Sequence, residues 1–189
     1  MDAAKKRLEE AGWILKAGGE VRTKAGIPLT MKLYYNTSSS SQKAQAELIQ
    51  NTLKKIGVEL ELVGEESSSI EHRRLTGNYD MLFDQTWGLP YDPQSTLAAF
   101  TPNYSSYNYA TSGISQADEL YRKIEEVMVS VDEETRKALY ADILTIIHNE
   151  AVFIPITNGK LTVVAPSGLQ GLAFKQTQYG LPFERMYFD

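Results

Sequence analysis

Residues 29–63 contain two stretches in which apolar and polar side chains alternate, Leu29-Thr30-Met31-Lys32-Leu33-Tyr34-Tyr35 and Val58-Glu59-Leu60-Glu61-Leu62-Val63. Such alternation is typical of β-strands. Between them, the polar run 36–41 offers helix-capping side chains, and residues 42–56 have helical spacing. A strand, a helix and a strand within so short a span predict a parallel pair joined by a right-handed crossover.

A second unit of the same kind follows directly. Residues 67–75 predict a helix, Gly77-Asn78 predicts its end, and residues 79–83 predict a third strand. The sequence therefore predicts an α/β fold with a mixed, largely parallel sheet flanked by helices.

The segments on either side have weaker or purely helical patterns. We expect, in chain order, a helix over 3–10 that ends near Gly12, a surface excursion or small hairpin over 15–28, a short helix over 92–100, a tyrosine-rich loop over 101–113, amphipathic helices over 115–130 and 132–149, strands over 152–156 and 161–164, and an irregular tail over 172–189. A chain of 189 residues suits a single domain over 1–189.

Composition excludes several classes of function. The 19 basic and 24 acidic residues give a net charge of −5 without a large basic cluster, so we expect no nucleic-acid partner. No apolar window is long enough for a transmembrane helix, so we expect no membrane insertion by this segment. The absence of Cys excludes disulfides, thiolate zinc sites and a cysteine nucleophile.

The run Asp84-Gln85-Thr86-Trp87-Gly88-Leu89-Pro90-Tyr91-Asp92-Pro93 follows the third predicted strand. Two prolines constrain its backbone, and its two large aromatic side chains are flat and rigid, as the wall of a ligand site requires. The alternative is a turn whose Trp87 and Tyr91 fill the core. Ligands collect at the carboxyl ends of strands in open α/β sheets, and this position favours a binding loop.

Catalytic and metal-binding patterns are sparse. The two histidines, His72 and His148, fall in separate predicted helices and fit solvated helix positions, so we expect no direct metal ligand. No Gly-x-Ser-x-Gly motif is present, and we expect no catalytic residues. Within this aromatic run, Asp84 and Asp92 lie on either side of Trp87 and Tyr91. This leaves a distant alternative, a small α/β hydrolase that uses the two carboxylates.

Several motifs, in their order along the chain, resemble the peptide and nickel solute-binding proteins of ABC importers (family 5 extracellular solute-binding proteins). The nickel-binding branch is the most similar, because the segment Gly64-Glu65-Glu66-Ser67-Ser68-Ser69-Ile70 and the aromatic run both resemble it. The other motifs are Ala11-Gly12-Trp13, Gln50-Asn51-Thr52-Leu53-Lys54-Lys55-Ile56-Gly57-Val58, Gly77-Asn78-Tyr79-Asp80, Thr135-Arg136-Lys137-Ala138-Leu139-Tyr140 and Glu150-Ala151-Val152-Phe153-Ile154-Pro155-Ile156.

The resemblance implies a periplasmic-binding-protein type II-like lobe. This chain would be the C-terminal lobe of a two-lobe protein whose N-terminal lobe is absent here. It implies an extracytoplasmic binding protein, in the periplasm or on the outer face of the cell membrane, that is not an enzyme. Its ligand would be nickel carried as a metal chelate with a small organic chelator, and its partner an ABC permease. The alternative within the family is an oligopeptide-binding protein.

The resemblance also implies ligand-binding residues. Trp87 and Tyr91 would stack on the chelate, and Thr86 and Gly88 would orient it. Some relatives carry a His near the position of Ser105, which this chain lacks, so hydrogen bonds rather than metal coordination are expected there. Further contributors to the site would be Tyr104, Ser105 and, on a weaker match, Tyr179.

Overall fold

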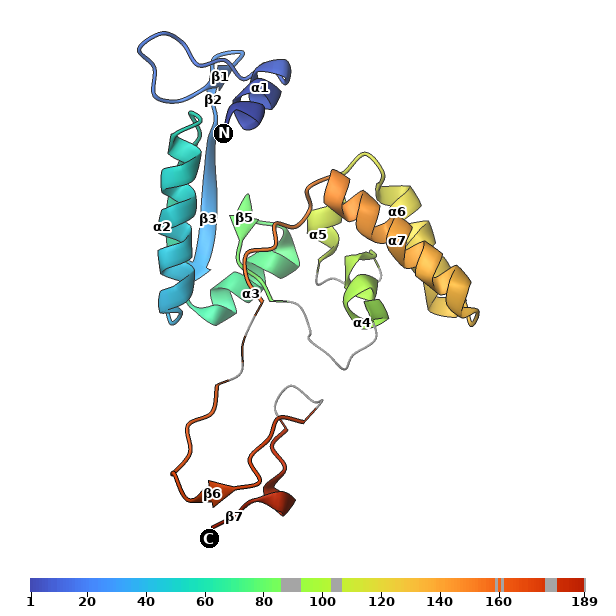
Figure 1. Cartoon of the computed structure of the whole chain (residues 1–189). Coiled ribbons are helices and arrows are strands. Elements are labelled where there is room, and N and C mark those ends of the chain that lie inside the picture. The colour runs from blue at the N-terminus through green and yellow to red at the C-terminus, as the bar shows by residue number, and fades with distance from the viewer. Residues whose placement is uncertain (86–92, 103–106, 159, 161, 176–179, 189) are drawn as a thin grey trace. The chain divides into compact units, whose positions relative to one another are not determined.

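The structure is a computed structural model and describes residues 1–85, 93–102, 107–158, 160, 162–175 and 180–188 (Figure 1). The chain forms two compact units, Met1–Gln85 and Thr86–Asp189. The single domain over 1–189 stays a prediction. Among the described residues, no helix has the length and apolar character needed to cross a membrane.

The first unit contains a three-stranded parallel sheet. Its strands are β3 (Thr30–Asn36), β4 (Glu59–Glu65) and β5 (Met81–Leu82), in the order β4-β3-β5. Leu33 of β3 lies opposite Leu62 on one side and Met81 on the other. The predicted strand-helix-strand units and their parallel pairing are thereby confirmed, although β5 is shorter than the predicted strand.

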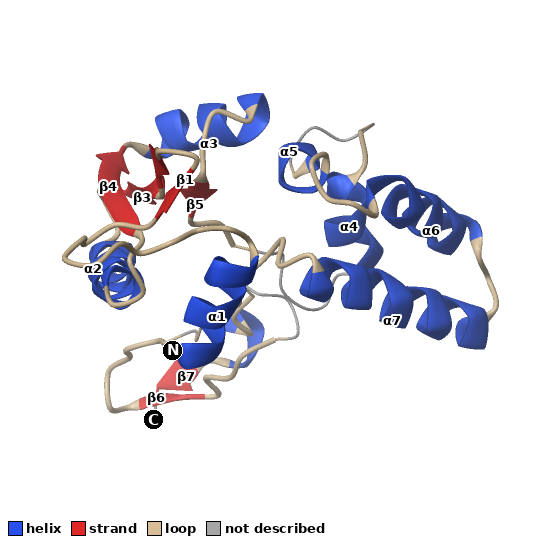
Figure 2. Cartoon of the chain, turned by 90° about the horizontal axis from the view of Figure 1, so that it is seen from above, coloured by secondary structure: helices blue, strands red, loops and turns tan. Residues whose placement is uncertain are grey.

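Two helices cover opposite faces of this sheet, α2 (Ser40–Lys54) and α3 (Ser67–Thr76) (Figure 2). This follows from the strand order. The crossovers β3-α2-β4 and β4-α3-β5 run in opposite directions along the sheet, and right-handed crossovers of opposite direction place their helices on opposite faces. The side chain of Ser39 caps α2 by accepting from the Gln42 amide at 3.3 Å. Gly77, at φ +71°, ends α3 in the left-handed conformation.

The core of the first unit lies between β3, β4 and α2. Leu33, Ala46 and Leu60 are buried, and each comes from a different element. Partly buried apolar side chains surround them, namely Met31, Tyr35, Ile49, Leu53, Leu62, Met81 and Phe83. The alternation that predicts the strands is therefore the pattern that fills this core.

The N-terminal segment is a helix followed by a small hairpin. Helix α1 (Asp2–Glu10) precedes the antiparallel strands β1 (Thr23–Lys24) and β2 (Ile27–Pro28), joined by Ala25 and Gly26 at positive φ. Both elements are as the sequence predicts.

A buried arginine ties this segment to the end of α2. Arg22 is 2% exposed, and its guanidinium donates to the carbonyl oxygens of Ile56 and Trp13 at 2.7 and 2.8 Å and to Glu9 Oε1 at 3.1 Å. Gly57 permits this approach, because a Cβ at its φ of +80° would lie 2.9 Å from Arg22 Cγ. The position therefore requires glycine.

The second unit contains a helical hairpin. Helices α6 (Ala117–Val129) and α7 (Glu133–Asn149) lie side by side (Figures 1 and 2) and follow the shorter elements α4 (Pro93–Leu97), η1 (Ala98–Phe100) and α5 (Asn108–Thr111). Asp132 caps α7 as predicted, accepting from the Thr135 amide at 2.8 Å. The buried core consists of Leu97, Phe100, Tyr107, Leu120, Ile124, Val127, Leu139, Ile143 and Ile146.

Four predictions for the second unit are wrong. The described residues of 152–156 and 161–164 form no strand; Ile154 and Val164 are 69% and 93% exposed. A short apolar, β-branched run supplies apolar side chains but not the neighbouring strand that backbone hydrogen bonds require. The loop 101–113 contains α5, and the tail 172–189 contains η2 (Phe183–Arg185) and β7 (Tyr187–Phe188).

The tail forms a short antiparallel ribbon. Strand β7 pairs with β6 (Leu169–Gln170), directly before Gly171. A Cβ on Gly171 would lie 1.8 Å from the Arg185 carbonyl oxygen, so the close approach needs a glycine. Strands of two residues are too short to show a period in the sequence, which is why the ribbon was not predicted.

Candidate functional site

The strand order places a topological switch point between β3 and β5. From β3 the chain crosses to β4 on one side and then returns to β5 on the other. In open parallel sheets, ligands bind outside the carboxyl ends of the strands at such a point. The Phe83 amide donates to the Tyr34 carbonyl at 3.2 Å, and Asp84 and Gln85 follow. The described chain therefore leads into the aromatic run from the switch point.

Hydrogen bonds join the end of β3 to β4 and to both flanking helices. The backbone amide of Asn36 donates to Gln42 Oε1 at 2.8 Å, and its Nδ2 donates to Ser67 Oγ at 2.7 Å. The amide of Thr37 donates to the Glu65 carbonyl at 2.9 Å. Asn36 thus joins the end of β3 to both flanking helices at the carboxyl edge.

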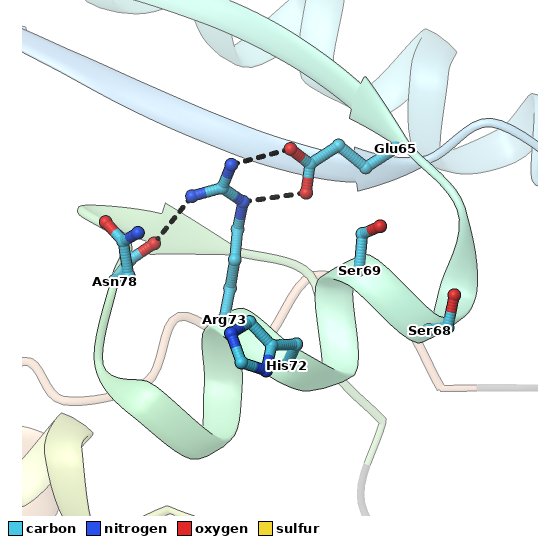
Figure 3. A pocket seen from close by; sticks show the side chains of 6 residues that line it. All are labelled: Glu65, Ser68, Ser69, His72, Arg73 and Asn78. Carbon is cyan, nitrogen blue, oxygen red and sulfur yellow. Dashed lines mark hydrogen bonds and ion pairs between the residues drawn. The ribbon is translucent and has the colours of Figure 1, made fainter.

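A shallow, open hollow of about 310 Å³ lies over α3 near this edge (Figure 3). Hydrogen bonds between its own residues use much of its polar lining, which is why we assign it no ligand. Its lining residues are Glu65, Ser68, Ser69, His72, Arg73 and Asn78.

Arg73 fixes α3 to the sheet. Its Nε and Nη2 each donate to a different Glu65 oxygen at 2.7 Å, and its Nη1 donates to the Asn78 carbonyl at 3.0 Å (Figure 3). Its guanidinium also lies 4.0 Å from the Tyr34 ring centroid. The hydrogen bonds from Arg73 lower the pKa of Glu65, and the same pairing raises the pKa of Arg73. Both groups stay charged, as a bidentate pair requires.

The neighbouring arginine reaches the chain beyond β5. Arg74 Nε lies 3.7 Å from Asp84 Oδ2, and the other Asp84 oxygen accepts from the Gln85 amide at 2.7 Å. Burial raises the pKa of Tyr79, the Asp84 charge raises it further, and Arg74 lowers it. Asp84 therefore serves as an ion-pair partner at the exit of β5.

The predicted ligand-binding residues lie outside the described residues. The same holds for Asp92, so its pairing with Asp84 in a hydrolase stays untested. The residues in question are Thr86, Trp87, Gly88, Tyr91, Tyr104, Ser105 and Tyr179. Their roles stay predictions.

Both histidines lie exposed on helices, as predicted, His72 on α3 and His148 near the end of α7. In the part of the chain that the structure describes, no group of three His, Asp or Glu side chains is arranged to hold a metal ion.

The Tyr107 ring packs in the core, with ring centroids 5.4 Å from Phe100 and 5.9 Å from Phe153.

The sequence did not predict the ion pairs of Arg73 with Glu65 and of Arg74 with Asp84. Arg73 and Arg74 follow Glu71 on a short helix, a pattern that predicts only a solvated face. Adjacent helical residues point about 100° apart, so each arginine meets a different carboxylate. The available signals were the arginine pair in the last turn and the Asp directly after the strand.

A sequence model of the bacterial extracellular solute-binding proteins, family 5 (middle region), matches residues 1–108. This is more than half of the chain. The chain belongs to this family. The family resemblance of the sequence motifs is thereby confirmed.

Named relatives of this family 5 chain include both nickel and peptide binders. The nickel-binding periplasmic protein of Escherichia coli K12 is 38% identical over 184 residues, which cover 97% of this chain and 35% of the relative. An oligopeptide-binding protein OppA of Mycobacterium bovis is 29% identical over 170 residues, 89% of this chain and 27% of the relative. Both relatives are named as binding proteins, not enzymes.

A solved structure agrees with the fold. NikA from Brucella suis in complex with Fe(III)-EDTA is 38% identical and superposes with a TM-score of 0.87 over 100% of this chain and 38% of that chain. The periplasmic-binding-protein type II-like α/β fold is thereby confirmed. This family 5 chain spans a little over a third of the length of the Escherichia coli relative and of the Brucella suis protein.

Proposed function

We propose that this chain is the C-terminal lobe of an extracytoplasmic solute-binding protein that delivers nickel, as a chelate with a small organic chelator, to an ABC permease. The observation that carries the proposal is the 38% identity to a nickel-binding periplasmic protein across nearly all of the chain. In this proposal the opposing lobe and the permease are partners outside the chain, and the chain has no catalytic role.

The proposed ligand site begins where the chain leaves β5. Asp84 and Gln85 lie at the switch point, and the aromatic run continues from them. Trp87 and Tyr91 present flat faces to the chelate, and Thr86 and Gly88 orient it by hydrogen bonds. The remaining proposed contributors are Tyr104, Ser105 and Tyr179.

Ligand contacts made only in a closed two-lobe form would shift the protein from open to closed. A shift from 1:99 to 99:1 requires that the ligand bind the closed form roughly 10⁴-fold more tightly than the open form. An aromatic wall on one lobe provides only part of that difference, so both lobes must contact the ligand. The permease would then recognise the closed form.

The second candidate is an oligopeptide-binding protein of the same family. The similarity to OppA over 89% of the chain favours it. In that case Trp87 and Tyr91 would pack on peptide side chains in a larger, hydrated cleft.

The test is a titration of the full-length parent protein. Wild type, Trp87→Phe and the matched control Trp13→Phe, which removes the other tryptophan of this chain, are each titrated by calorimetry. The ligands are free Ni²⁺, Ni²⁺ with histidine, Ni²⁺ with a small polycarboxylate, and mixed oligopeptides. We expect chelated nickel to bind wild type and Trp13→Phe alike, and Trp87→Phe to bind at least about 5-fold more weakly because it loses indole stacking area.

Each outcome separates the two candidates. Binding of peptides without binding of any nickel species would support the peptide binder and refute the nickel proposal. Equal affinity of Trp87→Phe and Trp13→Phe for chelated nickel would refute the aromatic wall.

A further inference from the structure

Arg74, in the last turn of α3, binds two carboxylates. Its Nη2 donates to both oxygens of Glu71, one turn earlier, at 2.5 Å, and its Nε donates to Glu71 Oε2 at 3.1 Å. The same Nε lies 3.7 Å from Asp84 Oδ2, an ion-pair distance. The side chains of Arg74 and Asp84 are 15% and 27% exposed. Charge pairs this far withdrawn from water are screened less than pairs on the open surface.

The ion pair joins the helix to the point where the chain leaves the sheet. Asp84 is the second residue after β5, and its Oδ1 accepts from the next amide, that of Gln85, at 2.7 Å. One carboxylate oxygen thus contacts Arg74, and the other fixes the backbone direction of the following residue. Tyr79 is partly buried nearby, and its pKa responds to the charges of both Asp84 and Arg74.

Attachment of α3 to the sheet does not depend on this pair. Arg73 already provides it through Glu65, the Asn78 carbonyl and the Tyr34 ring. The carboxylate partner of Arg73 lies at the end of β4, whereas that of Arg74 lies beyond β5. The two adjacent arginines therefore secure different parts of the structure.

We propose that Arg74 is a positioning residue for ligand recognition. Through Asp84 it fixes the direction in which the chain leaves β5 and enters the aromatic run. Arg74 itself does not contact the ligand. This inference rests on the proposed function of the aromatic run, and it assigns to Asp84 a role in orientation rather than in acid–base chemistry. Preorganisation of a binding segment lowers the free-energy cost of ordering it on binding.

The chain offers a control with a similar pairing pattern in a more exposed position. On α6, Arg122 also pairs with a glutamate three residues earlier, Glu119, and with a second carboxylate, Glu126. Arg122→Met removes the same chemistry from a helix that does not precede the aromatic run. The test set is Arg74→Met, Asp84→Asn, their double variant, the conservative Arg74→Lys, and Arg122→Met.

Two readouts are taken on the full-length parent protein. The first uses 5-fluorotryptophan and ¹⁹F NMR without ligand, with the Trp87 resonance assigned by Trp87→Phe. The second is the Kd for Ni²⁺ with histidine. We expect Arg74→Met and Asp84→Asn to move or sharpen the Trp87 resonance, to leave the Trp13 resonance unchanged, and to raise Kd roughly 5- to 20-fold. The double variant should add little to the loss in Arg74→Met, since each single variant already removes the Arg74–Asp84 pair.

Arg74→Lys should recover most of the affinity if charge pairing with Asp84 is what matters. A Trp87 resonance that is the same in Arg74→Met and Arg122→Met would overturn the inference, as would additive losses in the double variant. If wild type fails to bind any nickel species, the nickel function fails, while the ligand-free Trp87 resonance still decides whether Arg74 positions the run.

Discussion

The buried Arg22 permits a quantitative prediction for stability. Arg22→Met keeps most of the apolar length of the side chain but removes all three guanidinium hydrogen bonds. The carbonyls of Ile56 and Trp13 lose a charged donor in buried or partly buried surroundings. An unpaired buried acceptor costs about 1–3 kcal/mol, so two of them cost about 2–6 kcal/mol.

Part of that cost is recovered. The folded state no longer has to bury a guanidinium, and removing that desolvation cost offsets some of the loss. Glu9 contributes little to the balance, because its side chain is 56% exposed and returns to water. We therefore expect the free energy of unfolding of the first unit to fall by about 2–4 kcal/mol.

The assay is urea unfolding of the chain followed by Trp13 fluorescence in a Trp87→Phe background, so that the signal comes from the first unit. With an m-value of about 2 kcal/mol/M, the midpoint should fall by about 1–2 M. Arg22→Lys should recover little, because an ammonium lacks the planar fork that reaches acceptors in different directions.

Glu9→Gln and Arg122→Met are the controls, each expected to cost at most about 1 kcal/mol. A loss in Glu9→Gln equal to that in Arg22→Met would refute the reasoning, since it would assign the stabilisation to the exposed ion pair and not to the carbonyls.

Two further predictions concern a pKa and a buried hydroxyl. Hydrogen bonds from Arg73 lower the pKa of Glu65 below its ordinary 4.5, so their stabilisation is complete above that value and is lost as the pH falls through the lowered pKa. Thermal melts from about pH 6 to about pH 3 should therefore show a smaller loss of stability in Glu65→Gln than in wild type, and equal losses would contradict the pairing. In the second unit, the fully buried Thr111 hydroxyl donates to the Phe100 carbonyl at 2.9 Å. Urea unfolding should show Thr111→Val less stable by about 1–3 kcal/mol, with Thr111→Ser close to wild type; equal stability of the two variants would argue against the hydrogen bond.

Local signals predict most elements of the first unit. Alternation at residues 29–35 and 58–63, the cap at Ser39 and the stop at Gly77 all act over a few residues. These signals depend on the periodicity of the side chains and on residue types that favour a particular backbone conformation. Both can be read from the sequence. The same is true of the two long helices and of the cap at Asp132.

The same reasoning fails where an element depends on a distant partner. Residues 152–156 have a strand-like pattern, yet the described chain provides them with no strand pairing. The ribbon of β6 and β7 shows the opposite case. The two residues of β6 have no clear strand pattern, yet they pair with β7, and Gly171 allows the close approach. Pairing is decided by which backbone groups lie opposite one another, and sequence period does not report that.

For the candidate site, the sequence places the aromatic run after the third strand, and the strand order then shows that this strand borders the switch point. The partners of Arg22, Arg73 and Arg74 come from the tertiary structure alone, since each guanidinium meets groups on other elements.

The sequence by itself determined the α/β class, the family, and the position of the aromatic run along the chain. Tertiary structure decided the order β4-β3-β5 and the carboxylate that each arginine binds. The physical reason is range: helix and strand propensities are set within a few residues, whereas burial and ion pairing depend on surfaces that only folding brings together.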